Sequence, residues 1–207
     1  MPRRESETAR PSVFPDGWEE RHEALLLELA RSAIRHGTRT GNAPSVDLDG
    51  LPVPLREPRA CFVTLRKRGE LRGCIGSLEA RQALAYDTSD NAFKAAFRDP
   101  RFAAVEAAEL PELEIHISVL SPLERVHVDS EGELLALLQP GIDGVLLVQP
   151  PCRGTFLPSV WEGLPEPEQF LRELKRKAGL PEEHWSEDLE VWRYTTQSMD
   201  GRWQSVE

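Results

Sequence analysis

The 207-residue sequence lacks any long hydrophobic run. No apolar stretch approaches the ~20 residues that a membrane-spanning helix needs. Arg3 and Arg4 are not followed by the apolar segment of a secretory signal. We therefore expect a cytoplasmic protein with no membrane contact.

Cysteine is scarce, with only Cys61, Cys74 and Cys152 in the chain. An odd number of widely spaced cysteines excludes a disulfide framework and a CxxC zinc or redox site. The five histidines show no metal-ligand spacing, and no glycine-rich stretch matches a dinucleotide or P-loop pattern. The sequence thus predicts no metal site and no resident cofactor.

Positive charge is in deficit, because the formal net charge is −10. Nucleic-acid backbones and anionic membranes repel such a chain, which argues against non-specific binding to either. A local basic pocket remains compatible with this overall charge.

The hydrophobic pattern predicts an α+β fold with a mainly antiparallel sheet flanked by helices, because strands come as hairpins without a regular βαβ rhythm. Two hairpins are expected, and the alternation at 113–119 is the clearest strand signal. Most of the expected helices end at a glycine or a proline, and the first is expected to end at Gly37. The expected helices are 18–36, 81–98, 130–138 and 166–178, and the expected strands are 60–65, 71–78, 113–119, 145–148, 155–157 and 189–195.

The segment 71–78 carries the main candidate site, around Arg72, Gly73, Cys74 and Gly76. Two glycines inside a strand call for a bulge, or for close approach of a ligand or of another backbone. The cationic residues at 66–68 and Arg72 favour the thiolate form of Cys74, and they are also able to hold a phosphate or carboxylate. Free cysteine is often buried, so simple packing of Cys74 stays an alternative.

The hairpin register follows from the turn. A two-residue turn at Arg68-Gly69 places Cys74 opposite Val63, with Cys61 on the same face at a diagonal distance of ~7–8 Å. That is too far for a relaxed disulfide, although a shifted register would bring the two thiols closer.

Two further groups of polar residues stand out. His116 falls on the polar face of its strand, so it is either exposed or turned toward a cleft. The cations at 175–177 lie near the end of a helix, where they offset the helix dipole, and we assign them that role.

A series of segments along the chain matches one known family in order. They are Val63-Thr64-Leu65, Leu71-Arg72-Gly73-Cys74-Ile75-Gly76-Ser77-Leu78, Asn91-Ala92, Ala95-Ala96-Phe97-Arg98-Asp99-Pro100-Arg101-Phe102, 109–115, 118–122, Phe156-Leu157-Pro158-Ser159-Val160-Trp161-Glu162 and 174–180. On these segments the sequence resembles the AMMECR domain family over roughly residues 20–196, in particular the bacterial members called AmmeMemoRadiSam system protein A.

The resemblance implies a larger and a smaller lobe with a cleft between them, and it implies that segment 71–78 lines this cleft. We expect one domain at 17–199, with a flexible tail at 1–16 and a C-terminal tail at 200–207. The bacterial members accompany a radical SAM protein and a Memo-like protein, which are therefore the expected partners. The resemblance does not supply a reaction.

Three functions remain open. In the first, which we favour, an accessory protein binds a small anionic ligand, a nucleotide or a polypeptide in the cleft. Arg72 would hold the anion, Gly73 and Gly76 would let backbone approach, and His116 would contribute to the site. In the second, Cys74 is the catalytic nucleophile or a redox thiol, with His116 nearby. In the third, the segment only packs the hairpin.

Overall fold

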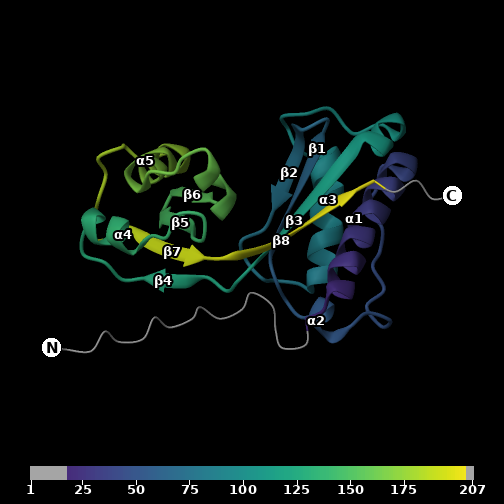
Figure 1. The fold of residues 1–207 in the computed structure, drawn as a ribbon, viewed down its shortest axis with the longest axis horizontal. Coiled ribbons are helices and arrows are strands. Elements are labelled where there is room, and N and C mark those ends of the chain that lie inside the picture. Colours follow the sequence, from purple (N-terminus) through teal and green to yellow (C-terminus); the bar gives the residue numbers. More distant parts are fainter. Residues whose placement is uncertain (1–17, 204–207) are drawn as a thin grey trace.

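The protein consists of two lobes, each built on a four-stranded sheet, in a computed structural model that describes residues 18–203 (Figure 1). The larger lobe contains α1 (Glu20–Thr40), α2 (Val53–Arg56), β1 (Cys61–Lys67), β2 (Glu70–Gly76), α3 (Leu84–Phe97), the 3-10 helix η1 (Ala107–Glu112), β3 (Leu113–Leu120) and β8 (Thr196–Arg202). The smaller lobe contains β4 (Glu124–Val126), α4 (Glu131–Leu137), β5 (Gly144–Gln149), β6 (Cys152–Phe156), the 3-10 helix η2 (Pro158–Glu162), α5 (Pro167–Ala178) and β7 (Glu190–Tyr194).

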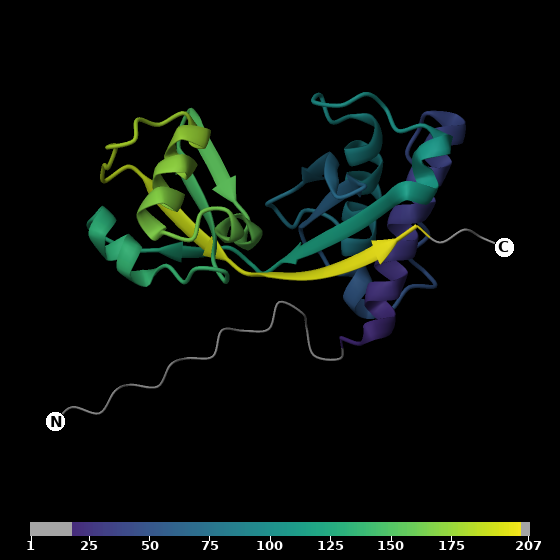
Figure 2. The same ribbon diagram turned by 45° about the horizontal axis from the view of Figure 1, so that its top comes forward.

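Both sheets are antiparallel throughout, with strand orders β2-β1-β3-β8 and β4-β7-β5-β6. The chain passes between the lobes twice, from β3 to β4 and from β7 to β8 (Figure 2). The backbone N–H of Ser121 donates to the Thr195 carbonyl (2.9 Å), and the Ser121 hydroxyl accepts from the Thr195 N–H (3.0 Å), so the two crossings are tied together. The predicted α+β class is confirmed.

Each lobe has its own hydrophobic core. In the larger lobe, α1 and α3 pack on one face of the sheet, and the inward residues of β1 and β3 are buried there. In the smaller lobe, α5 packs on β5 and β6, where Phe170 stacks on Trp161 with ring centroids 3.7 Å apart. A small third cluster around Leu120, Leu146 and Tyr194 lies where the lobes join.

The sequence placed several boundaries differently from the structure. The first helix does not end at Gly37 but continues to Thr40 and is capped by Gly41 in the left-handed region (φ 71°). Gly37 lies inside the helix. A Cβ at this position would be 2.2 Å from the Phe97 ring, so a glycine here permits close packing of α1 on α3. Strands β4 and β8 were missed, and β8 runs to Arg202. The tail expected at 1–16 lies outside the described residues.

The predicted hairpin of β1 and β2 is confirmed, but its register is shifted by one residue. Arg68 (φ 53°) and Gly69 (φ 83°) form the two-residue turn, and a β-bulge follows at once, because Arg66 pairs with Leu71 whereas Leu65 pairs with Gly73. Arg72 is the extra residue of the bulge.

As a result Cys74 lies opposite Thr64 and not Val63. Side chains alternate between the faces of a sheet, so one residue of shift places Cys74 on the face away from the helices and Cys61 on the face toward them. Cys61 is fully buried in the core. The expectation that the two cysteines share a face is therefore wrong, and a redox pair between them is excluded.

Candidate functional site

Arg72 is held by η1 and by the loop that precedes it. Its guanidinium donates twice to Glu109, through Nε to Oε2 (3.1 Å) and through Nη2 to Oε1 (2.9 Å). Further donations reach the carbonyls of Ala103 (2.8 Å) and Ala104 (3.3 Å). Hydrogen bonds from Arg72, and next from Lys67, lower the pKa of Glu109 from an ordinary 4.5 to about 2. The bulge thus aims Arg72 at a structural partner, which leaves little of the guanidinium for a ligand.

Each glycine of the segment allows one close contact. A Cβ on Gly73 would lie 2.1 Å from the Ala95 carbonyl oxygen, so its absence lets α3 approach β2. A Cβ on Gly76 would lie 2.2 Å from the Phe62 ring, which therefore rests on the β2 backbone. The first contact is the backbone approach that the sequence predicted, and the second involves an aromatic side chain.

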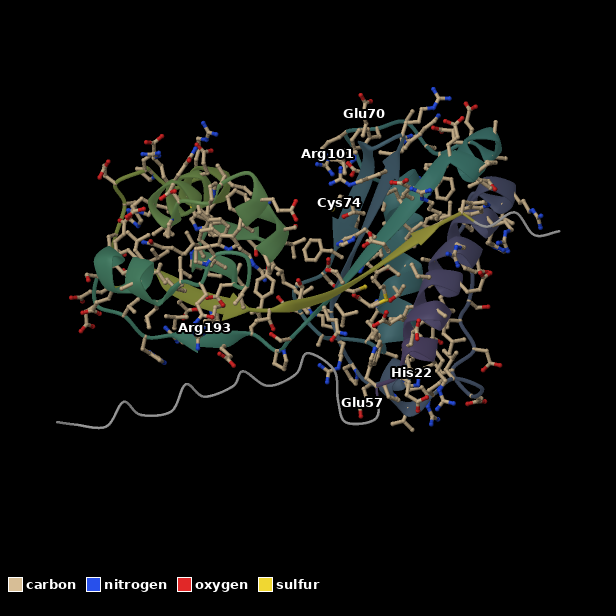
Figure 3. The ribbon with its side chains drawn as sticks, viewed as in Figure 1. His22, Glu57, Glu70, Cys74, Arg101 and Arg193 are labelled. Atoms are coloured by element: carbon tan, nitrogen blue, oxygen red, sulfur yellow. The ribbon has the colours of Figure 1, made fainter. Side chains whose placement is uncertain are left out.

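Cys74 is anchored by Asp99 and Arg101, which follow α3. The Cys74 N–H donates to Asp99 Oδ2 (2.9 Å), and Arg101 Nη2 donates to the Cys74 carbonyl (3.3 Å). Asp99 also accepts from Arg101 Nε (2.9 Å) and Nη2 (2.7 Å), and hydrogen bonding from Arg101 holds the pKa of this buried carboxyl well below its usual range. Asp99 and Arg101 thereby replace a neighbouring strand at the free edge of β2, with Arg101 held beside Cys74 (Figure 3).

The Cys74 thiol lies at one end of a row of polar side chains across the open face of the sheet. Thr64 Oγ1 donates to Cys74 Sγ (3.2 Å), and in the same row His116 Nδ1 bonds Asp200 Oδ1 (2.8 Å). His116 Nε2 bonds the Ser118 hydroxyl (3.1 Å). His116 is thus near the site but bonds β8, and Thr64 separates it from Cys74.

The cleft between the lobes holds a cavity of about 510 Å³. The larger lobe contributes Phe62, Gly76, Ser77 and Leu78, and the smaller lobe contributes Arg153, Gly154, Thr155 and Lys177. An ion pair crosses the cleft from Arg153 to Glu79 (3.4 Å). Segment 71–78 therefore reaches the cavity through its last three residues, whereas Arg72 and Cys74 are not among the residues that line it.

Lys177, at the end of α5, faces the larger lobe. Its ammonium donates to the Thr155 carbonyl (2.9 Å) and lies 5.0 Å from the centroid of the Phe156 ring. Desolvation is the largest cause and lowers the pKa of Lys177, the interaction with Cys74 opposes this shift, and the charge of Arg101 adds a smaller lowering. Lys177 and Arg101 are thus two cations from different lobes that interact with each other and with Cys74.

A buried carboxylate, Asp87 of α3, shapes the loop that lines the cavity. It accepts from the Ser77 hydroxyl (2.7 Å), the Gln82 amide (3.1 Å), the Asn91 amide (3.0 Å) and the Cys61 N–H (2.8 Å). This network fixes the segment between β2 and α3 against β1. On the same side of the sheet, burial raises the pKa of the Cys61 thiol and leaves it in the neutral form.

Sequence reasoning missed Asp87, Asp99, Arg101 and Lys177. Asp99 and Arg101 lie in the matching segment 95–102, and Asp87 lies in the expected helix 81–98. The sequence gives no sign of which strand these side chains contact. Lys177 was assigned to the helix dipole together with its two neighbours, whereas in the structure each cation of that run has its own surroundings. Lys175 is fully buried and donates to Glu131 (2.7 Å), while Arg176 is exposed and paired with Glu173.

Within residues 18–203, no group of three or more His, Cys, Asp or Glu side chains is arranged to hold a metal ion. The helices in that range are also too short or too polar to cross a membrane.

The fold and the cleft define a two-lobed α+β protein in which the end of segment 71–78 lies at the lobe boundary. The AMMECR1 family model matches residues 27–199, and the chain belongs to this family, as the sequence resemblance predicted. A Thermotoga maritima protein is 42% identical over 174 residues, which cover 83% of this chain and 94% of that protein. A Methanothermobacter thermautotrophicus protein is 35% identical over 178 residues, which cover 83% and 90%. The crystal structure of the uncharacterized protein PH0010 from Pyrococcus horikoshii superposes with a TM-score of 0.83 at 31% identity, covering 89% of this chain and 94% of that one.

Proposed function

We propose that this protein binds a small anionic ligand in the cleft, between Arg101 of the larger lobe and Lys177 of the smaller lobe. The observation that carries the proposal is the position of the two cations: Lys177 lines the cleft cavity and donates to an uncharged partner, the Thr155 carbonyl (2.9 Å), while Arg101 lies on the larger lobe beside Cys74. An anion placed between them would gain charge-assisted hydrogen bonds from both lobes. Arg72, the anion holder expected from the sequence, is bonded to Glu109 and its side chain is only 14% exposed, whereas the side chain of Arg101, although paired with Asp99, is 53% exposed.

The test compares two neighbouring cations of α5. We expect Lys177→Gln to weaken binding of inorganic phosphate about tenfold, because a hydrogen bond to a charged group is lost. Arg176→Gln is the matched control: it removes the same charge from an exposed residue paired only with Glu173. NMR titration at low ionic strength measures both affinities, since salt screens such sites. Equal phosphate affinity in the two variants contradicts the proposal.

A comparison of the wild-type protein with Lys177→Gln also identifies the natural ligand. Metabolites captured from cytosol on the wild-type protein and on Lys177→Gln, and read by mass spectrometry, are expected to differ in an anionic compound. Capture of the same compounds by both proteins would place the binding site elsewhere.

A catalytic role of Cys74 is a second candidate, favoured by the Thr64 hydroxyl that donates to its sulfur and by the charges of Arg101 and Lys177. Neighbouring cations and hydrogen-bond donors are the surroundings in which reactive cysteines are found. His116 does not bond Cys74, and no other base among the described residues bonds the sulfur. We rank ligand binding above catalysis for that reason.

Alkylation kinetics test the state of the thiol. We expect iodoacetamide to label Cys74 in the native protein, and Lys177→Gln to slow labelling at neutral pH by roughly two- to fivefold, the effect of one exposed charge interaction. Cys61, which is buried, is expected to react only after denaturation and serves as the internal control. Labelling of Cys74 only after denaturation would remove the catalytic candidate.

We also propose that the protein works with a radical SAM protein and a Memo-like protein in the cytoplasm. The support is the resemblance to family members that accompany such proteins. Co-expression with a tagged partner, followed by purification at low salt, is expected to recover a complex, and separate elution of the proteins would count against it.

A further inference from the structure

The cavity beside the anion site has an aromatic surface on one side. The Phe62 ring lies on Gly76, where a Cβ would come within 2.2 Å of ring carbon Cγ. The side chain is half-buried and lines the cavity together with Leu78. The larger lobe therefore offers a ring and an aliphatic side chain at this point, and its two charged lining residues, Glu79 and Arg81, pair with each other.

On the opposite side, β6 contributes Arg153, whose guanidinium pairs with Glu79 (3.4 Å), together with Gly154 and Thr155. Gly154 has no side chain, and a Cβ at this position would lie 2.8 Å from the backbone of Ala178. The Thr155 hydroxyl donates to the Val145 carbonyl (2.8 Å) and also bonds the Tyr194 hydroxyl (2.7 Å), so its polar atom is turned into the smaller lobe. The Ser77, Glu79, Arg153 and Thr155 side chains that a flat group would meet here already have partners within the protein.

We infer that the ligand carries a planar ring that stacks on Phe62 while its anionic group lies at Lys177 and Arg101, as in a purine mononucleotide. This inference rests on the proposed function, since it extends the anion site into the adjoining cavity. Phe62 pairs with Gly76 and Thr64 pairs with Cys74, so the two residue pairs are separated by two residues along the strands, about 7 Å. The ring and the anion therefore need a short spacer such as a ribose. A cavity of about 510 Å³ lies in the range of small-molecule sites.

Binding measurements with four compounds separate the ring from the anion: AMP, adenosine, ribose 5-phosphate and inorganic phosphate. We expect AMP to bind about tenfold more tightly than ribose 5-phosphate, because stacking of a base on an aromatic ring adds to the affinity. Phe62→Leu keeps an apolar side chain but removes the ring. It is expected to bring AMP down to the affinity of ribose 5-phosphate without changing the affinity for ribose 5-phosphate itself.

Tyr86→Leu is the matched control, because Tyr86 is an exposed aromatic residue of α3 outside the cavity lining. It should leave all four affinities unchanged, and retained binding of ribose 5-phosphate shows that each variant is folded. Equal affinities for AMP and ribose 5-phosphate would overturn the stacking inference and leave the anion site standing. Absence of binding by every phosphate compound would overturn the proposed function. Binding of adenosine as tight as that of AMP would also overturn the anion site, because the phosphate would then add nothing to the affinity, and only the ring site would remain.

Discussion

Replacing Gly73 by alanine is expected to lower the free energy of unfolding by about 3 kcal/mol, at the upper end of what overpacking costs. The new methyl carbon would lie 2.1 Å from the carbonyl oxygen of Ala95 and 3.0 Å from its carbonyl carbon. Both atoms belong to the backbone of α3, so no side-chain rotation relieves the overlap. The helix and β2 must separate, which also disturbs Asp99 and its bond to Cys74. Urea unfolding followed by circular dichroism measures the loss.

Gly132→Ala is the control for this substitution. Gly132 lies in α4, and a Cβ there would meet no atom within 4 Å. Alanine is favoured over glycine inside a helix, so this variant should be more stable by ~0.5–1 kcal/mol. Unfolding midpoints that move in opposite directions support the packing role of Gly73. A Gly73→Ala variant as stable as the wild type would mean that β2 and α3 are not in the contact described here.

Much of the fold could be predicted because its signals are local. The alternation along β3 and the turn at Arg68-Gly69 depend on residues that are neighbours in sequence. The hairpin register could not be predicted, because the bulge at Arg72 is stabilised by Glu109, 37 residues further along the chain. One unpredicted residue in one strand was enough to place Cys74 on the opposite face.

The candidate site was predictable only in part for the same reason. The glycines of segment 71–78 indicated a close approach, but not whether a ligand, a helix or a ring approaches. Arg101 and Lys177 are 76 positions apart in the numbering and belong to different lobes, so they interact only because the two lobes lie side by side (Figure 1). Lys175, Arg176 and Lys177 look alike in sequence, and only the packing of α5 makes one of them buried, one solvated and one part of the cleft.

The ion pair of Arg72 with Glu109 predicts a specific dependence of stability on pH. The Glu109 side chain is 16% exposed, and its pKa falls from 4.5 to about 2 on folding. The folded state therefore favours the ionised carboxylate, and the contribution is fully present above pH ~5 and is lost as the pH falls toward 2. A pKa difference of this size between the folded and the unfolded state corresponds to about 3 kcal/mol in the free energy of unfolding.

We expect Glu109→Gln to be less stable than the wild type by about 3 kcal/mol at pH 7, and the two proteins to converge as the pH falls toward 2. Glu112→Gln is the matched control, since Glu112 belongs to the same 3-10 helix and pairs with Arg68, whose side chain is 77% exposed. An exposed pair contributes little, so this variant should follow the wild type at every pH. Chemical unfolding at a series of pH values provides the comparison. Parallel curves for Glu109→Gln and the wild type would show that Arg72 is not held by Glu109, and Arg72 would then be available to a ligand, as the sequence alone suggested.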